Sequence, residues 1–345
     1  MNSDTISDAN NEFDPFEKER ALREESSSWD TTNPVDAEDD DIPVIDFSDY
    51  FTTLDTDALK YVADRVRMAC EQTGFFTIIG HGISSERMEE MFSFVRKFHH
   101  LPLEIKQSVL MDQPDWPIGG VGYLPVKNRK LPTRDKGNLN EAFITKQDNQ
   151  VSLAENQWPD ESALPGFREV VTTYAMDMEA LGKKMLPAFA MALDMEPNYF
   201  DEAFVDPTWR LRMTHYPAVE GRPEDEFGIA PHVDTTFCTI LAQDQPGLTI
   251  FSERRKKWIK APLLKDAFIV NSGELLRQWT NDRFLSVKHF ANNNVGDRSR
   301  YSIPFFLNAN RDYKMACIPT CMGPGNPAKY PTISYGESQA IAQGE

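Results

Sequence analysis

The feature that most limits the fold is a change in hydrophobic pattern near residue 205. Before it, residues 56–73, 84–100 and 166–193 repeat apolar side chains at helical spacing. After it come short alternating segments, predicted as strands at 209–216, 237–243, 248–251, 267–271, 285–291 and 300–308. In the first strand, Trp209, Leu211 and Met213 face one side, and Arg210, Arg212, Thr214 and Tyr216 face the other. This order predicts a mixed α/β chain with a mainly β core, an antiparallel sandwich or barrel with helices packed outside it.

The charge of the chain is concentrated at its N-terminus. The 345 residues include 54 acidic and 36 basic ones, for a net charge of -18. Residues 1–41 hold 14 acidic and 3 basic residues, a net of -11, which leaves -7 for the other 304. We interpret residues 1–41 as an acidic, disordered tail. The remainder lacks the basic face that binding to nucleic acid or to anionic membranes requires.

The composition also indicates the cellular compartment of the protein. No apolar run reaches the ~18–20 residues of a membrane-spanning helix. The N-terminus lacks the basic and then apolar pattern of a secretory signal. Four cysteines are too few for a disulfide scaffold, and none forms a CxxC pair. These features predict a cytoplasmic protein with reduced thiols.

Two histidines and an aspartate have the spacing of a metal site. His232 and Asp234, in IAPHVDTTFCTIL, are two residues apart, so on a strand they share a face. His289, in FLSVKHFANN, follows 55 residues after Asp234. Two imidazoles and one carboxylate are the ligand set of non-haem Fe(II) oxygenases, which leaves three coordination positions open. The alternative for the HxD pair alone is a surface turn with a hydrogen-bonded histidine.

A second polar pair follows 11 residues after His289. Arg300 and Ser302, in RSRYSIPFF, are again two residues apart on a predicted strand. A guanidinium and a hydroxyl aimed the same way form a carboxylate-binding pair. The alternative is an exposed Arg–Ser pair on an edge strand.

In their order and spacing, HVD, KHF and RYS resemble the motifs of the isopenicillin-N-synthase-like family of 2-oxoglutarate/Fe(II) dioxygenases. IPVIDF, GFFTIIGHGI, RMTHYP, NSGELLRQWTN and YPTISYGE resemble further segments of that family, so the resemblance spans roughly residues 42–337. It implies a double-stranded β-helix (a cupin-like jelly roll) flanked by helices. Residues 42–120 would pack on a core formed by residues 121–345, with a lid loop near 120–140. Many members of the family are monomers, and we expect the same here.

The resemblance also implies roles for individual residues. The iron ligands would be His232, Asp234 and His289, and the distal carboxylate of 2-oxoglutarate would be bound by Arg300, Ser302 and Tyr216, with Thr214 nearby. Fe(II) would be the cofactor, with 2-oxoglutarate and O2 as co-substrates. Succinate and CO2 would be released while a C–H bond is hydroxylated, desaturated or used for oxidative cyclisation. The chain departs from the family pattern at Gly273–Glu274, where relatives carry Gly-Asp, and at His289–Phe290, where they carry His-Arg.

The substrate is predicted from one basic segment. KNRKLPTRDK (127–136) has a net charge of +4, with Lys127, Arg129 and Lys130 at its start, and follows the Gly-rich GGVGYLP. In the family this region lies near the mouth of the site. It would form a basic lid that attracts an anionic, carboxylate-bearing small molecule of specialised metabolism. The alternative is a solvated loop, which is also our interpretation of the basic run 254–257.

Further pocket residues are predicted on weaker grounds. They are Tyr123, Asn138, Phe143, Phe237, Leu276, Phe305 and Leu307. We expect Phe305 and Leu307 to continue the inward face of the strand that carries Arg300 and Ser302. For each aromatic residue, a place in the hydrophobic core is the alternative.

Two other functions compete with the 2-oxoglutarate-dependent one. Some members of the family, such as its oxidative cyclase, are Fe(II) oxidases that keep the Arg–Ser pair without consuming 2-oxoglutarate. A non-catalytic protein could also bind a small molecule on a retained barrel, but that alternative predicts a broken ligand set. Here His232, Asp234, His289 and the Arg–Ser pair are all present.

Overall fold

The computed structural model describes residues 21, 31, 33–111, 120–127, 137–148, 155–219, 226–292, 294 and 296–343. Its larger sheet has the strand order β2-β3-β11-β8-β13-β6-β5-β4. These strands are β2 (Val44–Asp46), β3 (Phe75–Ile79), β4 (Gly122–Leu124), β5 (Glu141–Lys146), β6 (Thr208–Tyr216), β8 (Cys238–Gln243), β11 (Phe268–Ser272) and β13 (Arg300–Asn308). All neighbours are antiparallel except β2 and β3.

The smaller sheet has the order β1-β10-β9-β12-β7. Its strands are β1 (Val35–Asp36), β7 (Ile229–His232), β9 (Leu248–Ser252), β10 (Lys257–Lys260) and β12 (His289–Ala291). Apolar residues from both sheets, including Phe75 and Ile269 from the larger and Ile250 and Ile259 from the smaller, form one buried cluster. The two sheets therefore pack against each other, as in a jelly roll, which confirms the predicted fold class.

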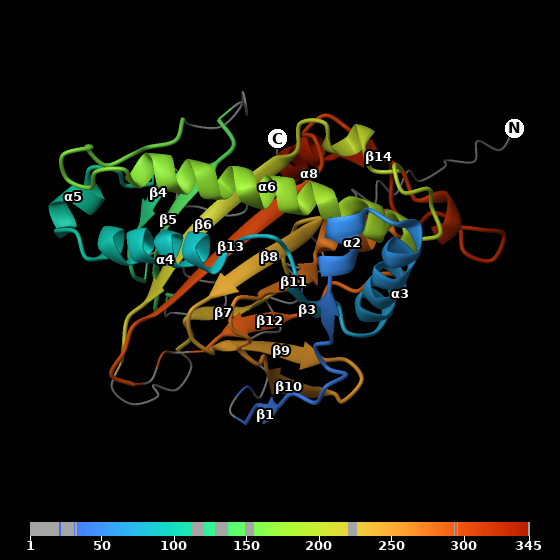
Figure 1. Cartoon of the computed structure of the whole chain (residues 1–345), viewed down its shortest axis with the longest axis horizontal. Helices are drawn as coiled ribbons and strands as arrows, with labels where there is room; N and C mark the ends of the chain where they lie inside the picture. Colours follow the sequence, from blue (N-terminus) through green and yellow to red (C-terminus); the bar gives the residue numbers. More distant parts are fainter. Residues whose placement is uncertain are drawn as a thin grey trace, which may run out of the picture.

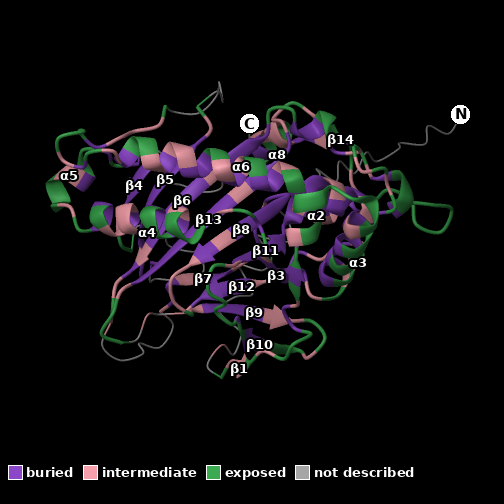
Figure 2. Cartoon of the chain, in the orientation of Figure 1, coloured by how far each residue is buried: buried purple, intermediate pink, exposed green. Residues whose placement is uncertain are grey.

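Helices cover the outer face of the larger sheet (Figure 1). The helices are α2 (Ser48–Thr53), α3 (Thr56–Gln72), α4 (Ser85–His99), α5 (Leu103–Gln107), α6 (Phe167–Ala192), α7 (Glu274–Trp279) and α8 (Tyr335–Gln343). Two 3-10 turns, η2 (Glu202–Phe204) and η3 (Pro319–Cys321), and a small ladder of β14 (Lys314–Met315) and β15 (Ile333–Ser334) complete the described elements. The main hydrophobic core lies between α3, α4 and α6 and this sheet. Figure 2 shows the buried strands beneath helices whose outer faces are exposed.

The ends of the predicted helices follow from their capping residues. Asp55 accepts hydrogen bonds from the Asp57 and Ala58 amides at the start of α3, and Ser84 accepts one from the Arg87 amide at the start of α4. In α4, Glu86 lies in the first turn and basic residues lie in the last, which suits the helix dipole. The predicted helices at 56–73, 84–100 and 166–193 are therefore confirmed within two residues at each end.

The structure corrects the prediction that residues 33–41 belong to a disordered tail. Strand β1 pairs in parallel with β10, and Asp41 is buried. The Asp41 carboxylate accepts hydrogen bonds from Arg254 at 3.2 Å and from Arg255 at 2.6 Å. Residues 253–256 form a turn in which Arg254 is exposed, as predicted, but Arg255 is half-buried against Asp41, so the interpretation of the run 254–257 as a solvated turn is wrong for Arg255. Residues far apart in sequence neutralise each other here, which no local pattern reveals.

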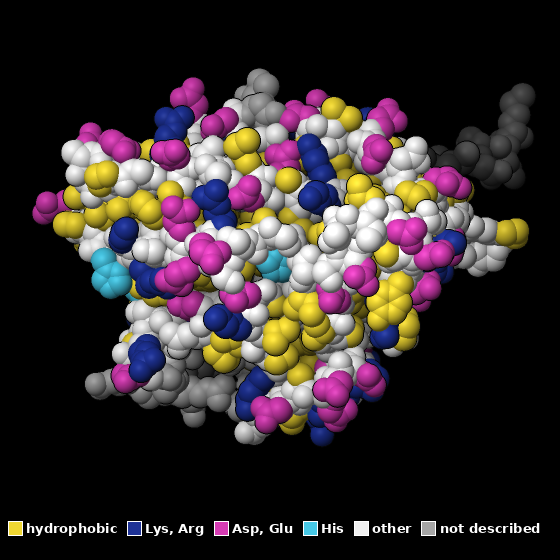
Figure 3. All heavy atoms as spheres, in the orientation of Figure 1, with side chains coloured by type: hydrophobic (Ala, Val, Ile, Leu, Met, Phe, Trp, Pro, Cys, Tyr) yellow, Lys and Arg dark blue, Asp and Glu magenta, His cyan; other side chains and the backbone are white. Residues whose placement is uncertain are grey.

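The surface carries mixed charge. On the face drawn in Figure 3, the described Lys and Arg side chains are interspersed with Asp and Glu rather than gathered in a broad patch. In the part of the chain that the structure describes, no helix combines the length and apolar character needed to cross a bilayer.

Candidate active site

The three predicted iron ligands converge at one end of the smaller sheet. His232 ends β7 and His289 begins β12, and the two are opposite each other in the antiparallel register. The prediction placed Asp234 on the same strand as His232, but it lies two residues beyond the end of β7. Its Oδ1 nevertheless lies 3.5 Å from His232 Nε2 and 3.7 Å from His289 Nε2. The structure thus brings together one ligand atom from each residue.

Hydrogen bonds hold each of these side chains in a metal-binding orientation. His232 Nδ1 lies 2.9 Å from the Ala230 carbonyl oxygen, and His289 Nδ1 lies 3.0 Å from that of Val287. Because a carbonyl oxygen only accepts, both Nδ1 atoms carry the proton and both Nε2 lone pairs stay free. The free lone pairs point towards the Asp234 carboxylate, where a cation can be held.

The Asp234 carboxylate is oriented through its second oxygen. Asp234 Oδ2 accepts hydrogen bonds from Thr239 Oγ1 at 2.7 Å and from Asn271 Nδ2 at 2.9 Å, which leaves Oδ1 for a metal. Sequence analysis missed Thr239 and Asn271. Thr239 lies five residues after Asp234, at the start of β8, whereas Asn271 lies on β11 and is placed beside Asp234 only by the tertiary fold.

The electrostatics of the three groups suit a divalent cation. Burial, together with the neighbouring His232, lowers the pKa of His289 to about 4. Burial raises the pKa of the Asp234 carboxyl, but His289, His232 and the Thr239 hydroxyl hold it below its usual range. At neutral pH His289 is therefore neutral and Asp234 is ionised, and these are the forms that bind metal.

The predicted carboxylate-binding residues face one another across two strands of the larger sheet. In the ladder between β13 and β6, Arg300 pairs with Tyr216 and Ser302 with Thr214. Tyr216 Oη lies 3.3 Å from Ser302 Oγ, and the Arg300 guanidinium lies 4.6 Å from the centre of the Tyr216 ring. The four residues therefore form one polar group on the interior face of the sheet.

The Arg300 guanidinium is fixed by two hydrogen bonds, but one of its donor atoms has no acceptor in the part of the chain that the structure describes. Its Nε donates to the Gln245 carbonyl at 3.1 Å, and Nη2 donates to Gln243 Oε1 at 3.0 Å. Its Nη1 is buried and has no partner among the described residues. A buried donor without an acceptor is unfavourable unless a ligand supplies one. A carboxylate such as that of 2-oxoglutarate fits this orphaned donor.

Gly247 provides the space for Arg300. A Cβ atom at this position would lie 2.7 Å from Arg300 Nε, and the backbone φ is 155°, a conformation that favours glycine. Sequence analysis did not single out Gly247 because the turn that contains it showed no motif. Its role depends on the approach of β13, which follows 53 residues later.

Several predicted pocket residues lie in the helix-facing core instead. Leu307 contacts α6, since a Cβ on Gly182 would lie 2.6 Å from Leu307 Cδ2. Phe305 lies two residues before Leu307 on β13, so both side chains are on the face opposite to that of Arg300 and Ser302. The prediction that Phe305 and Leu307 continue the face of Arg300 and Ser302 is therefore wrong. The same core contains Tyr123, Phe143, Phe237 and Leu276. Each of them is fully or nearly fully buried there, which corresponds to the core alternative rather than to a pocket lining.

The predicted lid loop is described only in part. Asn138 Oδ1 accepts a hydrogen bond from the Ala230 amide at 3.0 Å, and its carbonyl accepts one from the Lys127 amide at 3.0 Å. Lys127 is exposed, while Arg129 and Lys130 lie outside the described residues. The described ends of the loop are thus attached to β7, the strand that carries His232.

A second group of two histidines and a carboxylate lies near the outer face of the larger sheet. Its members are His99, Glu141 and His215. Glu141 Oε1 accepts a hydrogen bond from His215 Nδ1 at 2.7 Å. Glu141 Oε2 accepts from Lys106 Nζ at 2.9 Å and from Tyr123 Oη at 2.5 Å. We call these residues, with Lys106 and Tyr123, the closed cluster, because its carboxylate is already neutralised by the protein.

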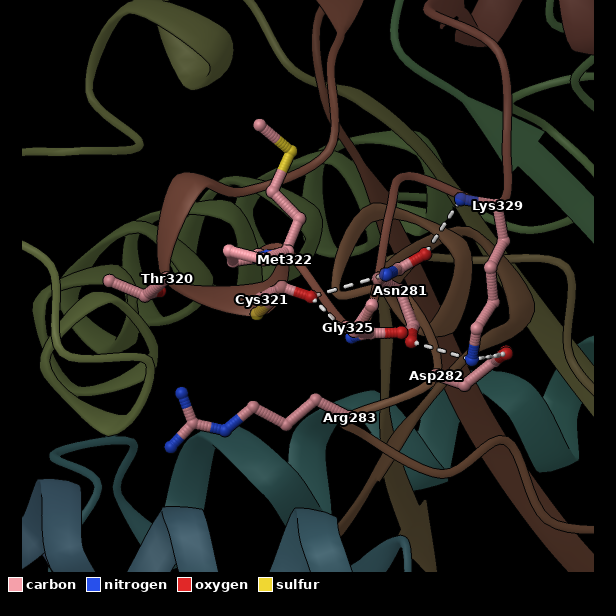
Figure 4. Close-up of a pocket in the computed structure, with 11 residues that line it drawn as sticks. Asn281, Asp282, Arg283, Thr320, Cys321, Met322, Gly325 and Lys329 are labelled. Carbon is pink, nitrogen blue, oxygen red and sulfur yellow. Dashed lines mark hydrogen bonds and ion pairs between the residues drawn. The ribbon is translucent and has the colours of Figure 1, made fainter.

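A separate surface hollow contains no comparable group (Figure 4). Its lining residues include Asn281, Asp282, Arg283, Cys321 and Lys329. Lys329 is paired with Asp282 at 2.8 Å, and the Arg283 guanidinium is paired with carboxylates outside the hollow. Its charged groups are thus already satisfied by the protein.

Comparison with known proteins agrees with this geometry. Residues 208–309 match the model of the 2OG-Fe(II) oxygenase superfamily, and residues 42–161 match that of the non-haem dioxygenase in morphine synthesis N-terminal region. The chain is 31% identical over 327 residues to the 2-oxoglutarate-Fe(II) type oxidoreductase hxnY of Emericella nidulans, covering 86% of this chain and 91% of that protein. The chain belongs to the 2OG-Fe(II) oxygenase superfamily.

Two further relatives support this membership. The chain is 33% identical over 296 residues to kihadalactone A synthase LFS of Citrus sinensis, covering 79% of this chain and 84% of the relative. The crystal structure of a full-length Neurospora crassa protein in complex with alpha-KG superposes with a TM-score of 0.80 at 25% identity, covering 91% of this chain and 99% of the other. This member of the superfamily is therefore an Fe(II)/2-oxoglutarate-dependent dioxygenase that uses Fe(II), 2-oxoglutarate and O2. That assignment favours the 2-oxoglutarate-dependent enzyme over the two competing functions.

Proposed function

We propose that this enzyme oxidises an unactivated C–H bond of a small, carboxylate-bearing specialised metabolite, with His232, Asp234 and His289 as its iron ligands. Held by these three residues, Fe(II) would supply, with 2-oxoglutarate and O2, the oxidising chemistry needed to break that C–H bond. The protein orients both organic molecules and excludes water from the site. Hydroxylation, desaturation and oxidative cyclisation are all compatible with this role.

The assignment of 2-oxoglutarate binding rests mainly on Arg300 Nη1, which is buried and has no hydrogen-bond acceptor among the described residues. Arg300 sits beside Tyr216 and Ser302, on the sheet opposite the one that carries His232 and His289. We assign to it the distal carboxylate of 2-oxoglutarate, because a guanidinium binds a carboxylate with two parallel hydrogen bonds. Ser302 and Tyr216 donate to the same carboxylate, and their hydroxyls are already 3.3 Å apart.

The substrate class rests on two supports. The relatives include kihadalactone A synthase of Citrus sinensis and azadirone synthase of Melia azedarach, whose names denote the formation of single organic products. The basic segment 127–136 carries a net charge of +4, and Asn138, two residues after it in the sequence, accepts a hydrogen bond from Ala230 on β7. We retain the proposals that this loop attracts an anionic substrate and that the protein is a cytoplasmic monomer.

The co-substrate assignment is tested by removing the guanidinium. In the Mn(II)-loaded wild type, we expect 2-oxoglutarate to bind about 10- to 100-fold more tightly than 2-oxopentanoate, which lacks the distal carboxylate. In Arg300→Gln this preference should fall to near unity, while 2-oxopentanoate still binds. Isothermal titration calorimetry measures both ligands with both proteins.

The matched control is Arg298→Gln, since Arg298 is exposed and two residues from Arg300. It should keep the wild-type preference and Mn(II) affinity. If Arg300→Gln still discriminates between the two oxo acids as the wild type does, the assignment of Arg300 is wrong.

A further inference from the structure

Arg212 is a second buried arginine on the interior face of the larger sheet. It lies on β6, two residues before Thr214 and four before Tyr216, so all three side chains share one face. Its Nε donates to Thr214 Oγ1 at 3.1 Å, which directs the guanidinium along the strand towards the co-substrate residues. Thr214 in turn is opposite Ser302 in the ladder.

The guanidinium of Arg212 lacks a counter-charge in the described part of the chain. Arg212 is 8% exposed, and its side chain donates to the neutral oxygens of Thr214 and Asn140. Arg212 and Arg300 are the two buried arginines among the described residues, and neither forms an ion pair with a described carboxylate. Half-buried arginines elsewhere in the described structure are paired with carboxylates, as in Arg67–Asp194, Arg255–Asp41, Arg277–Glu274 and Arg283–Glu71.

This arrangement is unfavourable without a ligand. Removing a cation from water is unfavourable unless an anion compensates for the lost hydration. Burial correspondingly lowers the pKa of Arg212, although a guanidinium stays charged at neutral pH. The two hydrogen bonds use two of its five N–H groups, so further donors remain for an anion.

Asn140 fixes the position of this guanidinium. Its Oδ1 accepts from Arg212 Nη2 at 2.7 Å, and its Nδ2 donates to the Gly228 carbonyl at 2.6 Å. Gly228 packs against the Tyr216 ring, since a Cβ there would lie 2.7 Å from Tyr216 Cδ1, and it directly precedes β7. Arg212 is therefore held between the co-substrate residues and the strand that ends at His232.

We propose that Arg212 binds the carboxylate of the organic substrate, while Arg300 binds that of 2-oxoglutarate. This inference rests on the proposed function and names the residue that selects an acidic substrate. A carboxylate accepts the remaining N–H groups of Arg212 and supplies the missing negative charge. The two anions are then held by two arginines on neighbouring strands, so each keeps its own site.

The test compares acids with their neutral amides on protein loaded with Zn(II) and 2-oxoglutarate, which does not turn over. Phenylacetate and hexanoate are titrated beside phenylacetamide and hexanamide, and binding is followed by ligand-observed NMR. In the wild type, at least one acid should bind about 10-fold or more tightly than its amide. In Arg212→Gln that preference should fall to near unity, and Arg212→Lys should recover part of it because it restores the charge.

Controls separate this inference from the proposed function. Arg65→Gln, which removes an exposed arginine of α3, should keep the wild-type preference. Binding of 2-oxoglutarate to the wild type is measured first, and its absence would reject the proposed function itself. If 2-oxoglutarate binds but no acid is preferred over its amide, Arg212 does not select a carboxylate. If Arg212→Gln weakens 2-oxoglutarate and leaves the acid preference intact, Arg212 serves the co-substrate, and the inference is also overturned.

Discussion

Two groups in this molecule contain two histidines and one carboxylate, but they differ in what else contacts them. In the group of His232, Asp234 and His289, both Nε2 atoms and Asp234 Oδ1 face one another, while neutral partners hold the other atoms. In the closed cluster, the ammonium of Lys106 already occupies the Glu141 carboxylate at 2.9 Å. A metal ion there would have to displace a buried cation and the Tyr123 hydroxyl.

The comparison shows that residue types alone do not make a metal site. Both groups bring their candidate ligand atoms within 4.8 Å of one another. The difference lies in the surrounding donors, since Thr239 and Asn271 orient Asp234 without adding charge, whereas Lys106 neutralises Glu141. Asp234 therefore keeps its negative charge available for a metal ion, whereas the charge of Glu141 is already compensated by Lys106.

The difference between the two groups is tested most directly by removing the carboxylate of each in turn. Asp234→Ala should lower Fe(II) binding beyond the ~10–100-fold typical of losing a residue that only orients a ligand. Glu141→Gln should retain one iron per chain, because the closed cluster does not bind iron. Iron content after anaerobic reconstitution measures both. The opposite result, with iron lost from Glu141→Gln and kept by Asp234→Ala, would reverse the assignment of the two groups.

The next effect concerns stability. Glu141→Gln leaves the Lys106 ammonium, 8% exposed, without its counter-ion, so it should lower the free energy of unfolding by about 3–5 kcal/mol. The double variant Lys106→Met/Glu141→Gln should recover much of that loss because no unpaired charge remains. Urea unfolding of the metal-free proteins provides the values. A double variant as unstable as the single one would show that the ion pair is not the main contribution of Glu141.

The smallest expected effect is on the pH dependence of stability. Burial lowers the pKa of His99 below its usual 6.5, so the folded state binds this proton less readily than the unfolded state. Stability from the neutral imidazole is therefore present above about pH 6.5 and is lost as the pH falls below it, at no more than ~1.4 kcal/mol per pH unit.

The measurement is urea unfolding at pH 7.5, 6.5 and 5.5. From pH 7.5 to 5.5 the free energy of unfolding should fall less in His99→Gln than in the wild type. In His100→Gln, which changes the exposed neighbour at the end of α4, it should fall as much as in the wild type. If the free energy of unfolding falls equally steeply with pH in the wild type and in His99→Gln, protonation of His99 does not contribute to the acid sensitivity of the protein.

The two groups also differ in how far they can be predicted from sequence. His232 and Asp234, like Arg300 and Ser302, are two residues apart, and the motifs HVD, KHF and RYS follow one another in a set order. The closed cluster combines residues 99, 106, 123, 141 and 215, which share no motif, and it was not predicted. Phe305 and Leu307 were placed on the wrong face, although their odd positions on β13 set them apart from Arg300 and Ser302.

Hydrophobic period predicted the order of helices and strands and an antiparallel β core, because it is a local property of the chain. The family resemblance of the motifs implied the jelly roll, the three iron ligands and the Arg300–Ser302 pair. Which buried polar groups find partners depends instead on the folded arrangement of distant segments. Asp41 neutralises Arg255, and Lys106 neutralises Glu141. In contrast, Arg300 Nη1 has no acceptor among the described residues, and Arg212 donates there only to neutral oxygens. Pairing of buried charges depends on side chains that folding brings together from distant segments, and for that physical reason it has no local signature.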